Sequence, residues 1–386
     1  MHEAGASRYM PTPTDDLYHE LALTLLPGIG PQLTRQLMSY GSSAKNVFLL
    51  PPGKLRRIPG VGEATLKILT GSARGAALTQ AEASLRKAEK EGVQILFYTN
   101  KQFPHRLKLI ADAPVLLYYQ GPANLNAPKV LALVGTRQAT EYGREQTERL
   151  MKGVLPHQPL IVSGLAYGID IMAHRAALQE GLATVGVMAT GLDIIYPAAH
   201  RKTAEKMRET GGLLTEFPFG TQPDRYNFPQ RNRIIAGLAD GTVVVEAAAK
   251  GGALITAELA LSYDRDVLAV PGPLGSPTSE GCNTLIKTNK AALYQEPRDL
   301  EQLLNWDAAL HLPGKFQPAP SYSADDFSAE EFSLVSVLAT APSRELHMDE
   351  LAWKAQQPIH AVAALLLGLE FRGVVRALPG KRFGLV

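Results

Sequence analysis

The sequence has few of the residues that mark several large classes of protein. It contains one cysteine, Cys282, in 386 residues, which excludes an intrachain disulfide framework and a zinc site built on cysteines. No apolar run approaches the roughly 20 residues that cross a bilayer, and residues 1–16 lack the apolar core of a secretory signal. The formal net charge is only +2. These absences predict a soluble cytoplasmic protein without a membrane span or a metal site.

Motifs for cofactor chemistry and catalysis are also missing. No G-x-G-x-x-G sequence follows the strand expected at 130–134, which weakens an interpretation as an NAD-dependent dehydrogenase. Asp170 and His174 lie four residues apart on a predicted helix, a spacing that suits metal or acid–base chemistry. Because no HExxH or comparable ligand set accompanies them, we interpret them as a carboxylate at a helix start paired with a buried histidine. We therefore expect no cofactor and no enzymatic activity.

What is present indicates a folded chain with several domains. Apolar residues make up 45% of the chain and charged residues 20%, a composition that can bury real cores. A length of 386 residues suits two or three domains. Changes of pattern predict a disordered tail at 1–16, a helical domain at 17–92, an extended α/β domain at 93–305, a linker at 306–325 and a small domain at 326–386.

The central region alternates strand-like and helix-like segments. Six apolar runs are separated by connections of about 20–30 residues, a spacing typical of βαβ units. We expect a mainly parallel sheet covered by helices on both faces, with ligands bound beyond the carboxyl ends of the strands. The runs are 130–134, 160–162, 184–188, 213–215, 242–245 and 267–270.

Two similar turns occur in the N-terminal region, LLPGIGP at 25–31 and RIPGVGE at 57–63. This is the helix-hairpin-helix pattern, in which glycines permit tight bends and amides at the next helix start can face a phosphate. Residues 17–92 carry ten Lys/Arg against five Asp/Glu, which favours a nucleic-acid contact over the alternative of turns used only for packing. The candidate residues for this secondary contact are Gly28, Gly30, Lys54, Arg56, Arg57, Gly60 and Gly62.

The C-terminal region has the element order of a winged helix. Helices are expected near 328–339, 347–355 and 359–372, followed by strands at 374–377 and 382–386. The third helix of a DNA-reading domain presents polar and basic side chains to the major groove. Here that helix is nearly all apolar, and residues 323–386 hold six cations against eight acids. We favour a role in protein interaction or packing over duplex DNA binding.

A basic and aromatic stretch occupies residues 225–247. Arg225, Arg231 and Arg233 alternate with Tyr226 and Phe228. Cations hold phosphate oxygens and aromatic faces stack on bases, so the pairing suits single-stranded nucleic acid. The alternative is a solvated arginine face with its aromatics in the core.

Two loops at strand ends have the composition of phosphate sites. The first strand of the series ends in Gly135, Thr136 and Arg137. A small residue allows close approach, a hydroxyl can donate, and an arginine can bind phosphate bidentately. The next strand is followed by Ser163 and Gly164 at a helix start, a second anion nest. We expect these loops and residues 225–247 to form one DNA cleft.

Six motifs occur in a fixed order between residues 130 and 286. They are VLALVGTR (130–137), IVSGLAYGIDIMAH (161–174), GLDIIYP (191–197), FPQRNRIIAGL (228–238), LITAELA (254–260) and SEGCNTLI (279–286). Together they resemble the DNA-processing protein A family, also called DprA or Smf, of bacterial natural transformation. The resemblance implies a Rossmann-like domain that binds incoming single-stranded DNA, loads the recombinase RecA onto it without catalysis, and forms a homodimer.

The resemblance also assigns roles to residues. Gly135, Thr136 and Arg137 correspond to the phosphate loop of the family, and Ser163 and Gly164 to a second loop of that pocket. Arg225 and Phe228 stand where the family has a basic residue and an aromatic beside the strand, and Arg231, Asn232 and Arg233 match its Arg-Asn-Arg signature. Members typically read Ser-Gly-Ser where this chain has Gly251, Gly252 and Ala253, so a contact there falls to backbone amides or to Lys250.

An enzyme acting on a nucleotide is the alternative function. Residues 251–258 loosely resemble the PGGxGTxxE loop of the phosphoribohydrolases that release cytokinin bases. However, the spacing from Gly to Thr is one residue too long, and Lys250 replaces the leading proline. We therefore prefer the DNA-binding interpretation.

Overall fold

The computed structural model describes residues 15–306, 327–341, 345–378 and 382–385. The chain divides into two compact units, 1–311 and 312–386, and each is described by itself. The expected N-terminal tail and linker lie almost entirely outside the described residues. One edge of each of these predicted segments is described. Asp15, predicted to lie in the tail, begins helix α1, and Trp306, predicted to lie in the linker, is buried in the first unit.

The first unit is built on a nine-stranded sheet with the order β1-β2-β6-β5-β4-β3-β7-β8-β9. Strands β3 to β9 run parallel, whereas β2 is antiparallel to both β1 and β6. The strands are β1 (Gln94–Phe97), β2 (Leu116–Gln120), β3 (Val130–Val134), β4 (Leu160–Ser163), β5 (Thr184–Val187), β6 (Gly212–Thr215), β7 (Gly241–Val244), β8 (Asp266–Ala269) and β9 (Ala292–Leu293).

The mainly parallel sheet and its six predicted strands are confirmed, each to within one residue at its ends. Strands β1, β2 and β9 were not predicted. The first two form an antiparallel extension of the sheet, outside the βαβ period that guided the prediction. Strand β9 has only two residues, both exposed, so it carries no apolar pattern.

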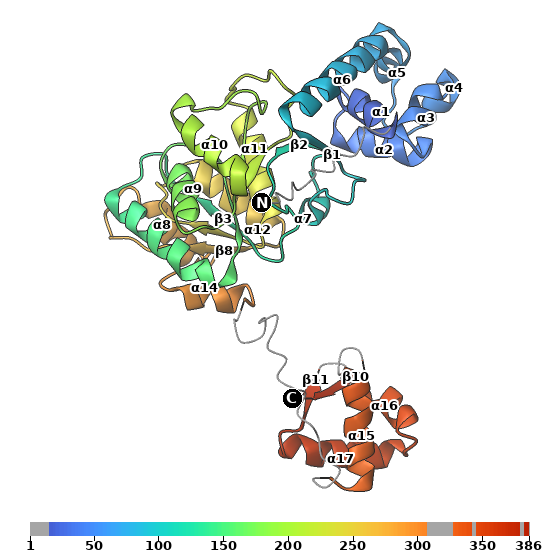
Figure 1. Cartoon of the computed structure of the whole chain (residues 1–386), viewed down its shortest axis with the longest axis vertical. Helices are drawn as coiled ribbons and strands as arrows, with labels where there is room; N and C mark the ends of the chain where they lie inside the picture. Colours follow the sequence, from blue (N-terminus) through green and yellow to red (C-terminus); the bar gives the residue numbers. More distant parts are fainter. Residues whose placement is uncertain (1–14, 307–326, 342–344, 379–381, 386) are drawn as a thin grey trace, which may run out of the picture. The chain divides into compact units, whose positions relative to one another are not determined.

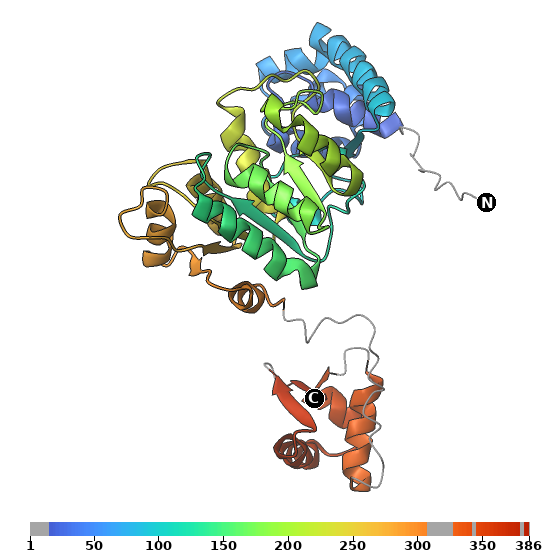
Figure 2. The same ribbon diagram turned by 60° about the vertical axis from the view of Figure 1, so that its left-hand side comes forward.

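Side chains alternate across the strands and bury against helices on both faces. In β3, Leu131 and Leu133 pack with residues of α8 and α9, whereas Val130, Ala132 and Val134 pack with α11 and α12. Figures 1 and 2 show these two groups of helices on opposite sides of the sheet. One layer holds α8 (Glu141–Val154), α9 (Ile169–Gln179), α10 (Arg201–Thr210) and α14 (Pro297–Leu303), and the other holds α7 (His105–Lys108), α11 (Asn227–Leu238), α12 (Gly252–Ser262) and α13 (Glu280–Lys287).

The strand order creates a switch point beside β3. The chain runs from β3 through β4 and β5 to β6, then returns to place β7 on the other side of β3. The connections on the two sides of such a point diverge, which leaves a crevice at the carboxyl ends of the strands. The candidate site is built in that crevice.

The N-terminal helices share a hydrophobic cluster with the sheet, in which Leu37 and Ala81 belong to the same core as Ile95 and Phe97 of β1. Arg35 Nη2 also donates to the carbonyl oxygen of Ala113 at 2.8 Å. The N-terminal helical region and the sheet therefore form one unit. The helices are α1 (Asp15–Thr24), α2 (Pro31–Gly41), α3 (Ala44–Leu49), α4 (Pro52–Leu55), α5 (Glu63–Thr70) and α6 (Ser72–Glu91).

The two glycine-rich turns adopt the same conformation. Gly28 and Gly60 have φ angles of 76° and 83°, which favour glycine because a Cβ is strained there. In each turn the next residue donates its amide to a carbonyl three residues back, and helices α2 and α5 begin three residues after these glycines. The predicted internal repeat is therefore present.

The second unit has the winged-helix order predicted from the sequence, with one additional strand. Its helices are α15 (Ala329–Thr340), α16 (Met348–Lys354) and α17 (Ile359–Phe371), and its sheet order is β10-β12-β11 (Glu345–His347, Arg382–Leu385 and Val375–Leu378). Leu334, Leu351 and Leu366 form part of its core. In both units, the described helices are each too short or too polar to cross a bilayer.

Candidate nucleic-acid interface

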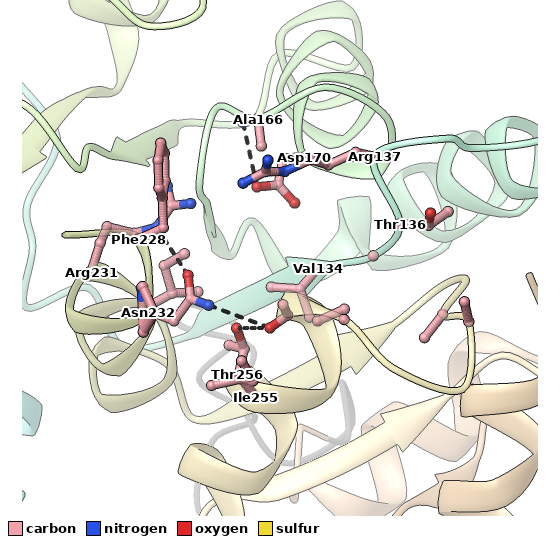
Figure 3. A pocket seen from close by; sticks show the side chains of 18 of the residues that line it. Val134, Thr136, Arg137, Ala166, Asp170, Phe228, Arg231, Asn232, Ile255 and Thr256 are labelled. Carbon is pink, nitrogen blue, oxygen red and sulfur yellow. Dashed lines mark hydrogen bonds between the residues drawn. The ribbon is translucent and has the colours of Figure 1, made fainter. Parts of the chain in front are cut away.

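A cavity of about 420 Å³ opens at the carboxyl ends of β3, β4 and β7 (Figure 3). It lies at the switch point of the sheet, where ligands of open α/β sheets bind. Four segments line it: the loop after β3, the start of α9 with the loop before it, the first turns of α11, and the loop from β7 into α12. The residues include Gly135, Thr136, Arg137, Ala166, Asp170, Phe228, Arg231, Asn232, Lys250, Gly251, Gly252 and Thr256.

The loop after β3 is held in place by backbone hydrogen bonds. Thr136 donates its amide to the carbonyl oxygen of Glu246 at 2.7 Å and accepts from the amide of Ile169 at 3.1 Å. A Cβ at Gly135 would overlap Ile169, so this glycine permits the close approach of α9. Arg137 is exposed and forms no hydrogen bond or ion pair with the described residues. Its guanidinium carbon lies 5.3 Å from the ring centre of Phe228.

The loop after β4 contributes buried contacts behind the cavity. Ser163 is fully buried, and its Oγ donates to the carbonyl oxygen of Leu133 at 2.6 Å. The hydroxyl is therefore engaged inside the protein, and a direct DNA contact by Ser163 stays a prediction. Gly164 lies where a Cβ would overlap the guanidinium of Arg231 and the carboxylate of Asp170. Only glycine leaves room for both groups.

Arg231 forms the floor of the pocket rather than an open phosphate contact. It is buried, and its Nη1 donates to the carbonyl oxygens of Gly164 and, at 2.7 Å, of Val187. Burial raises the pKa of Asp170, and the positive charge of Arg231 partly offsets that effect. Burial likewise lowers the pKa of Arg231, and Asp170 opposes this. The two groups compensate each other's charge beneath the cavity.

Phe228 lines both the main cavity and a small second one of about 30 Å³. Its ring centre is 5.9 Å from that of Tyr196, with the planes inclined by 49°. Tyr196 is 46% exposed and Tyr167 is 51% exposed, and both line the small cavity. An apolar ring that is partly exposed at a cavity is suited to stacking on a base.

The N-terminal end of α12 closes the other side of the pocket. Asn232 donates from Nδ2 to the carbonyl oxygen of Gly252 at 3.3 Å, and Thr256 donates from Oγ1 to the same oxygen at 3.1 Å (Figure 3). The first backbone amides of this 11-residue helix lie beside the cavity. The N-terminal end of a helix attracts anions. Lys250 is exposed at this rim and forms no ion pair within the described residues.

The remaining two predicted arginines lie outside the cavity. Arg225 is exposed, and its guanidinium donates to the Tyr226 hydroxyl at 2.7 Å. Arg233 donates to the carbonyl oxygen of Asp112 at 2.5 Å and pairs with Glu216, so its charge is already neutralised. Direct DNA contacts by these residues and by Asn232 stay predictions. Arg225 is the better placed of the two arginines, because no carboxylate pairs with it among the described residues.

The candidate residues of the N-terminal turns also lie outside this cavity. The glycines at 28, 30, 60 and 62 are exposed. Arg56 pairs with Glu63 at 2.9 Å, an exposed pair. A secondary contact with DNA by this region stays a prediction.

Three features of the site were not found from the sequence. Tyr167 and Tyr196 occur in quoted motifs, but no spacing indicated that they line a cavity beside Phe228. His174 is buried as predicted, yet its Nδ1 bonds with Thr184 Oγ1 at 2.7 Å and not with Asp170. The predicted pairing of Asp170 with His174 was therefore wrong, because Asp170 instead faces Arg231 across Gly164.

Replacing Gly251 with serine is expected to tighten binding of an oligonucleotide about two- to fivefold, the effect of one additional hydrogen bond of about 0.5–1 kcal/mol. A Cβ at Gly251 meets no atom within 4 Å, and the φ of 163° is extended backbone that any residue adopts. The new hydroxyl stands at the N-cap of α12, beside the cavity. Fluorescence anisotropy with a labelled strand measures the change, and Gly251→Ala is the control without the hydroxyl. Equal affinities of the two variants would contradict an anion site here.

Comparisons with known proteins identify the family of the chain. A family model described as DNA recombination-mediator protein A matches residues 94–305, more than half of the chain. The chain belongs to this family. The DprA winged helix domain matches residues 317–381. The relatives include Protein Smf of Escherichia coli K12, 37% identical over 301 residues that cover 78% of this chain and 79% of that protein.

Solved structures of other family members are similar as well. DNA processing protein A from Streptococcus pneumoniae superposes with a TM-score of 0.61 at 33% identity and covers 74% of this chain and 96% of its own. A structure from Helicobacter pylori, whose title describes the single-stranded DNA binding mode of its DNA processing protein A, has a TM-score of 0.51 at 28% identity. It covers 56% of this chain and 98% of its own. The family resemblance carried by the six motifs is confirmed.

Proposed function

We propose that this chain binds single-stranded DNA in the crevice at the end of the sheet and performs no chemical step on it. The observation that carries the proposal is the arrangement of Arg137, Lys250 and Phe228 around one cavity. Neither of the two cations at the rim pairs with a carboxylate among the described residues, and the aromatic ring lines both adjoining cavities. Phosphates bind to the cations and a base stacks on the ring, the pattern of single-strand binding. The relative from Helicobacter pylori supports the choice of DNA.

The groups around the cavity support a binding role without a catalytic step. Among the described residues that line the cavity, the carboxylate is that of Asp170, which is buried and faces Arg231. Thr256 donates its hydroxyl to the carbonyl oxygen of Gly252. Within the described part of the chain, no hydroxyl or thiol in this cavity is paired with a base, the arrangement that activates a nucleophile for covalent catalysis. Incubation with nucleoside monophosphates tests the rival enzyme, and steady release of free base would favour it.

We further propose the finer role that family membership suggests. The protein loads the recombinase RecA onto the bound strand during natural transformation, in the cytoplasm, and does so as a homodimer formed through the Rossmann-like unit. The support for these statements is the match to the recombination-mediator family over residues 94–305. RecA filament formation on single-stranded DNA covered by a competing single-strand binding protein, with and without this chain, tests the loading role.

Replacing Arg137 with alanine is expected to weaken single-strand binding roughly ten- to a hundredfold at low salt, the value of a hydrogen bond between charged groups. The slope of log affinity against log salt should become shallower by about 0.7, because one phosphate contact fewer releases fewer counterions. Salt-titrated anisotropy with an oligothymidine measures both. Lys152→Ala is the matched control, since it removes one exposed charge from the end of α8, outside the cavity. If both variants behave like the wild type, the cavity is not the binding site.

A further inference from the structure

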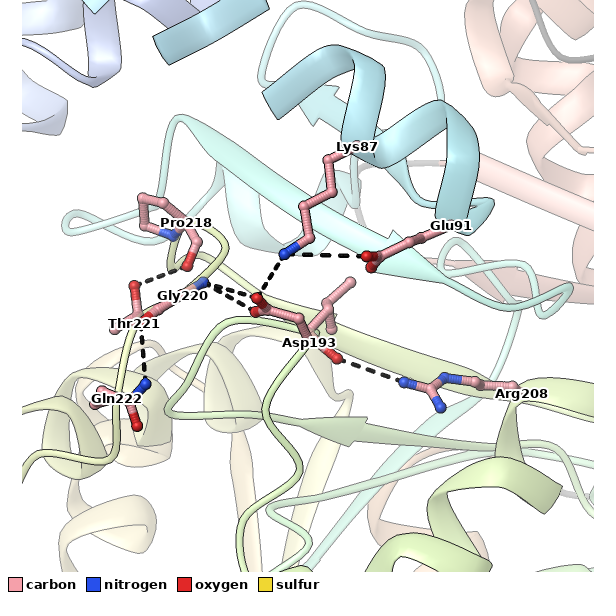
Figure 4. Close-up of polar contacts among 9 residues, drawn as sticks. Lys87, Glu91, Asp193, Arg208, Pro218, Gly220, Thr221 and Gln222 are labelled. Carbon is pink, nitrogen blue, oxygen red and sulfur yellow. Dashed lines mark hydrogen bonds and ion pairs between the residues drawn. The ribbon is translucent and has the colours of Figure 1, made fainter. Parts of the chain in front are cut away.

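The loop after β5 is joined to the loop after β6 by one carboxylate, that of Asp193 (Figure 4). The Gly220 amide donates to both of its oxygens, at 2.9 and 3.0 Å. Gly191 adds a backbone bond to the carbonyl oxygen of Thr221 at 3.1 Å. The two loops are therefore held together by a backbone hydrogen bond and by the side chain of Asp193.

The same carboxylate also receives a lysine from the N-terminal helical region. Lys87 of α6 reaches Asp193 Oδ2 at 2.7 Å, and its ammonium lies 4.8 Å from the ring centre of Phe219 in the second loop. Phe219 packs edge-on against Tyr118 of β2, with ring centres 5.4 Å apart. Burial alone would raise the pKa of Asp193, but the hydrogen bonds from Gly220 and Lys87 outweigh it and lower that pKa.

Both loops lead directly to the aromatic side of the DNA cavity. The first loop continues from Asp193 to Tyr196, three residues on, which lies against Phe228. The second loop continues to Arg225 and then to α11, which carries Phe228. Asn227 fastens the start of α11 to the carbonyl oxygen of Ala189 at 3.3 Å. A shift of the loops around Asp193 would therefore move Tyr196 and Arg225.

We propose that Lys87 and Asp193 form a latch through which the helical region positions the aromatic wall of the DNA cleft. Both are positioning residues, because neither lines the cavity. The latch gives the helical region a part in single-strand binding without a DNA contact of its own. This inference rests on the proposed DNA binding, but hydrogen exchange tests the latch without DNA.

Hydrogen exchange of the full chain, followed by mass spectrometry, tests the latch directly. Asp193→Ala should speed exchange in peptides covering 218–227, because the Gly220 amide loses its acceptor. Lys87→Met should speed it less, because it removes only the lysine that contacts Asp193 and the Phe219 ring. Lys90→Met, an exposed lysine on the same helix, is the matched control and should leave these peptides unchanged. Unchanged exchange in both latch variants would overturn the proposal, whether or not the protein binds DNA.

Oligothymidine binding then tests the positioning role. Lys87→Met should weaken binding about two- to fivefold, the fold-change equivalent to a partly exposed ion pair, and Asp193→Ala should weaken it more. The salt slope should stay that of the wild type in both, because no phosphate contact is lost. A shallower slope in Lys87→Met would identify a direct phosphate contact and overturn the latch, as would wild-type affinity in both single variants.

If Arg137→Ala and Phe228→Ala also bind like the wild type, the proposed cavity has failed rather than the latch. In that case the exchange measurement alone decides on the latch. The two outcomes are distinguishable, because the cavity variants leave the bonds of Asp193 intact and the latch variants leave the cavity side chains intact.

Discussion

Replacement of Arg231 by alanine is expected to lower the free energy of unfolding by about 3–5 kcal/mol, the effect of removing one partner from a buried charged arrangement. Two carbonyl oxygens, those of Gly164 and Val187, lose their donor, and each buried acceptor left unsatisfied costs about 1–3 kcal/mol. Asp170 would remain buried without the neighbouring positive charge. Urea unfolding followed by circular dichroism measures the loss.

The pH dependence of this variant gives a second check. Without Arg231, the already raised pKa of Asp170 rises further, because burial acts unopposed. An acid whose folded pKa lies above its unfolded value loses stability as pH rises through the folded pKa. The deficit relative to the wild type should therefore be larger at pH 8 than at pH 5. Arg137→Ala, an exposed change at the same cavity, should stay within about 0.5 kcal/mol of the wild type. A similarly small change in Arg231→Ala would show that the floor does not depend on this arginine.

Arg231 also illustrates how far the sequence could lead. Alternating arginines and aromatics at 225–233 predicted a binding surface, and within this stretch Phe228 and Arg231 line the cavity at the strand ends. However, the pattern could not show which arginines are buried or paired and which are exposed. Arg231 points inward because Gly164 leaves space for its guanidinium, and that space depends on a loop 67 residues away. Arg233 meets Glu216 only after β6 and α11 are packed in the fold.

The parts that sequence did predict are those with local physical causes. Strand β3 is an unbroken apolar run, buried on both faces, and its end fixed the position of Gly135 to Arg137. The parallel sheet followed from the spacing of such runs. The antiparallel strands β1 and β2, the contact of Tyr196 with Phe228 and the pairing of Lys87 with Asp193 arise from tertiary packing. The periodicity of apolar residues along the chain does not indicate such contacts between distant segments.

Replacement of Phe228 by alanine is expected to weaken single-strand binding about 5- to 150-fold, the equivalent of the 1–3 kcal/mol that stacking one base contributes. The ring is only partly buried, so the loss of unfolding free energy should be small beside that of Arg231→Ala. Anisotropy with an oligothymidine measures the affinity. Tyr40→Ala, an aromatic on α2 that is 59% exposed and outside the cavity, is the matched control. Equal affinities for Phe228→Ala and the wild type would remove the ring from the proposed site.

Combining Phe228→Ala with Arg137→Ala reveals where the base stacks. In the free protein the Arg137 guanidinium lies over the Phe228 ring, a contact worth about 0.5–1 kcal/mol at an exposed site. If a base replaces the guanidinium on that face, the wild type loses this contact on binding, and each single variant is spared that loss. The double variant should then bind about two- to fivefold more weakly than the two single effects combined. If the base takes the other face and Arg137 stays on the ring, the single effects add or overlap, because removing the ring also releases the arginine. The sign of the coupling therefore distinguishes an arginine that moves from the ring to a phosphate from one that is already in place.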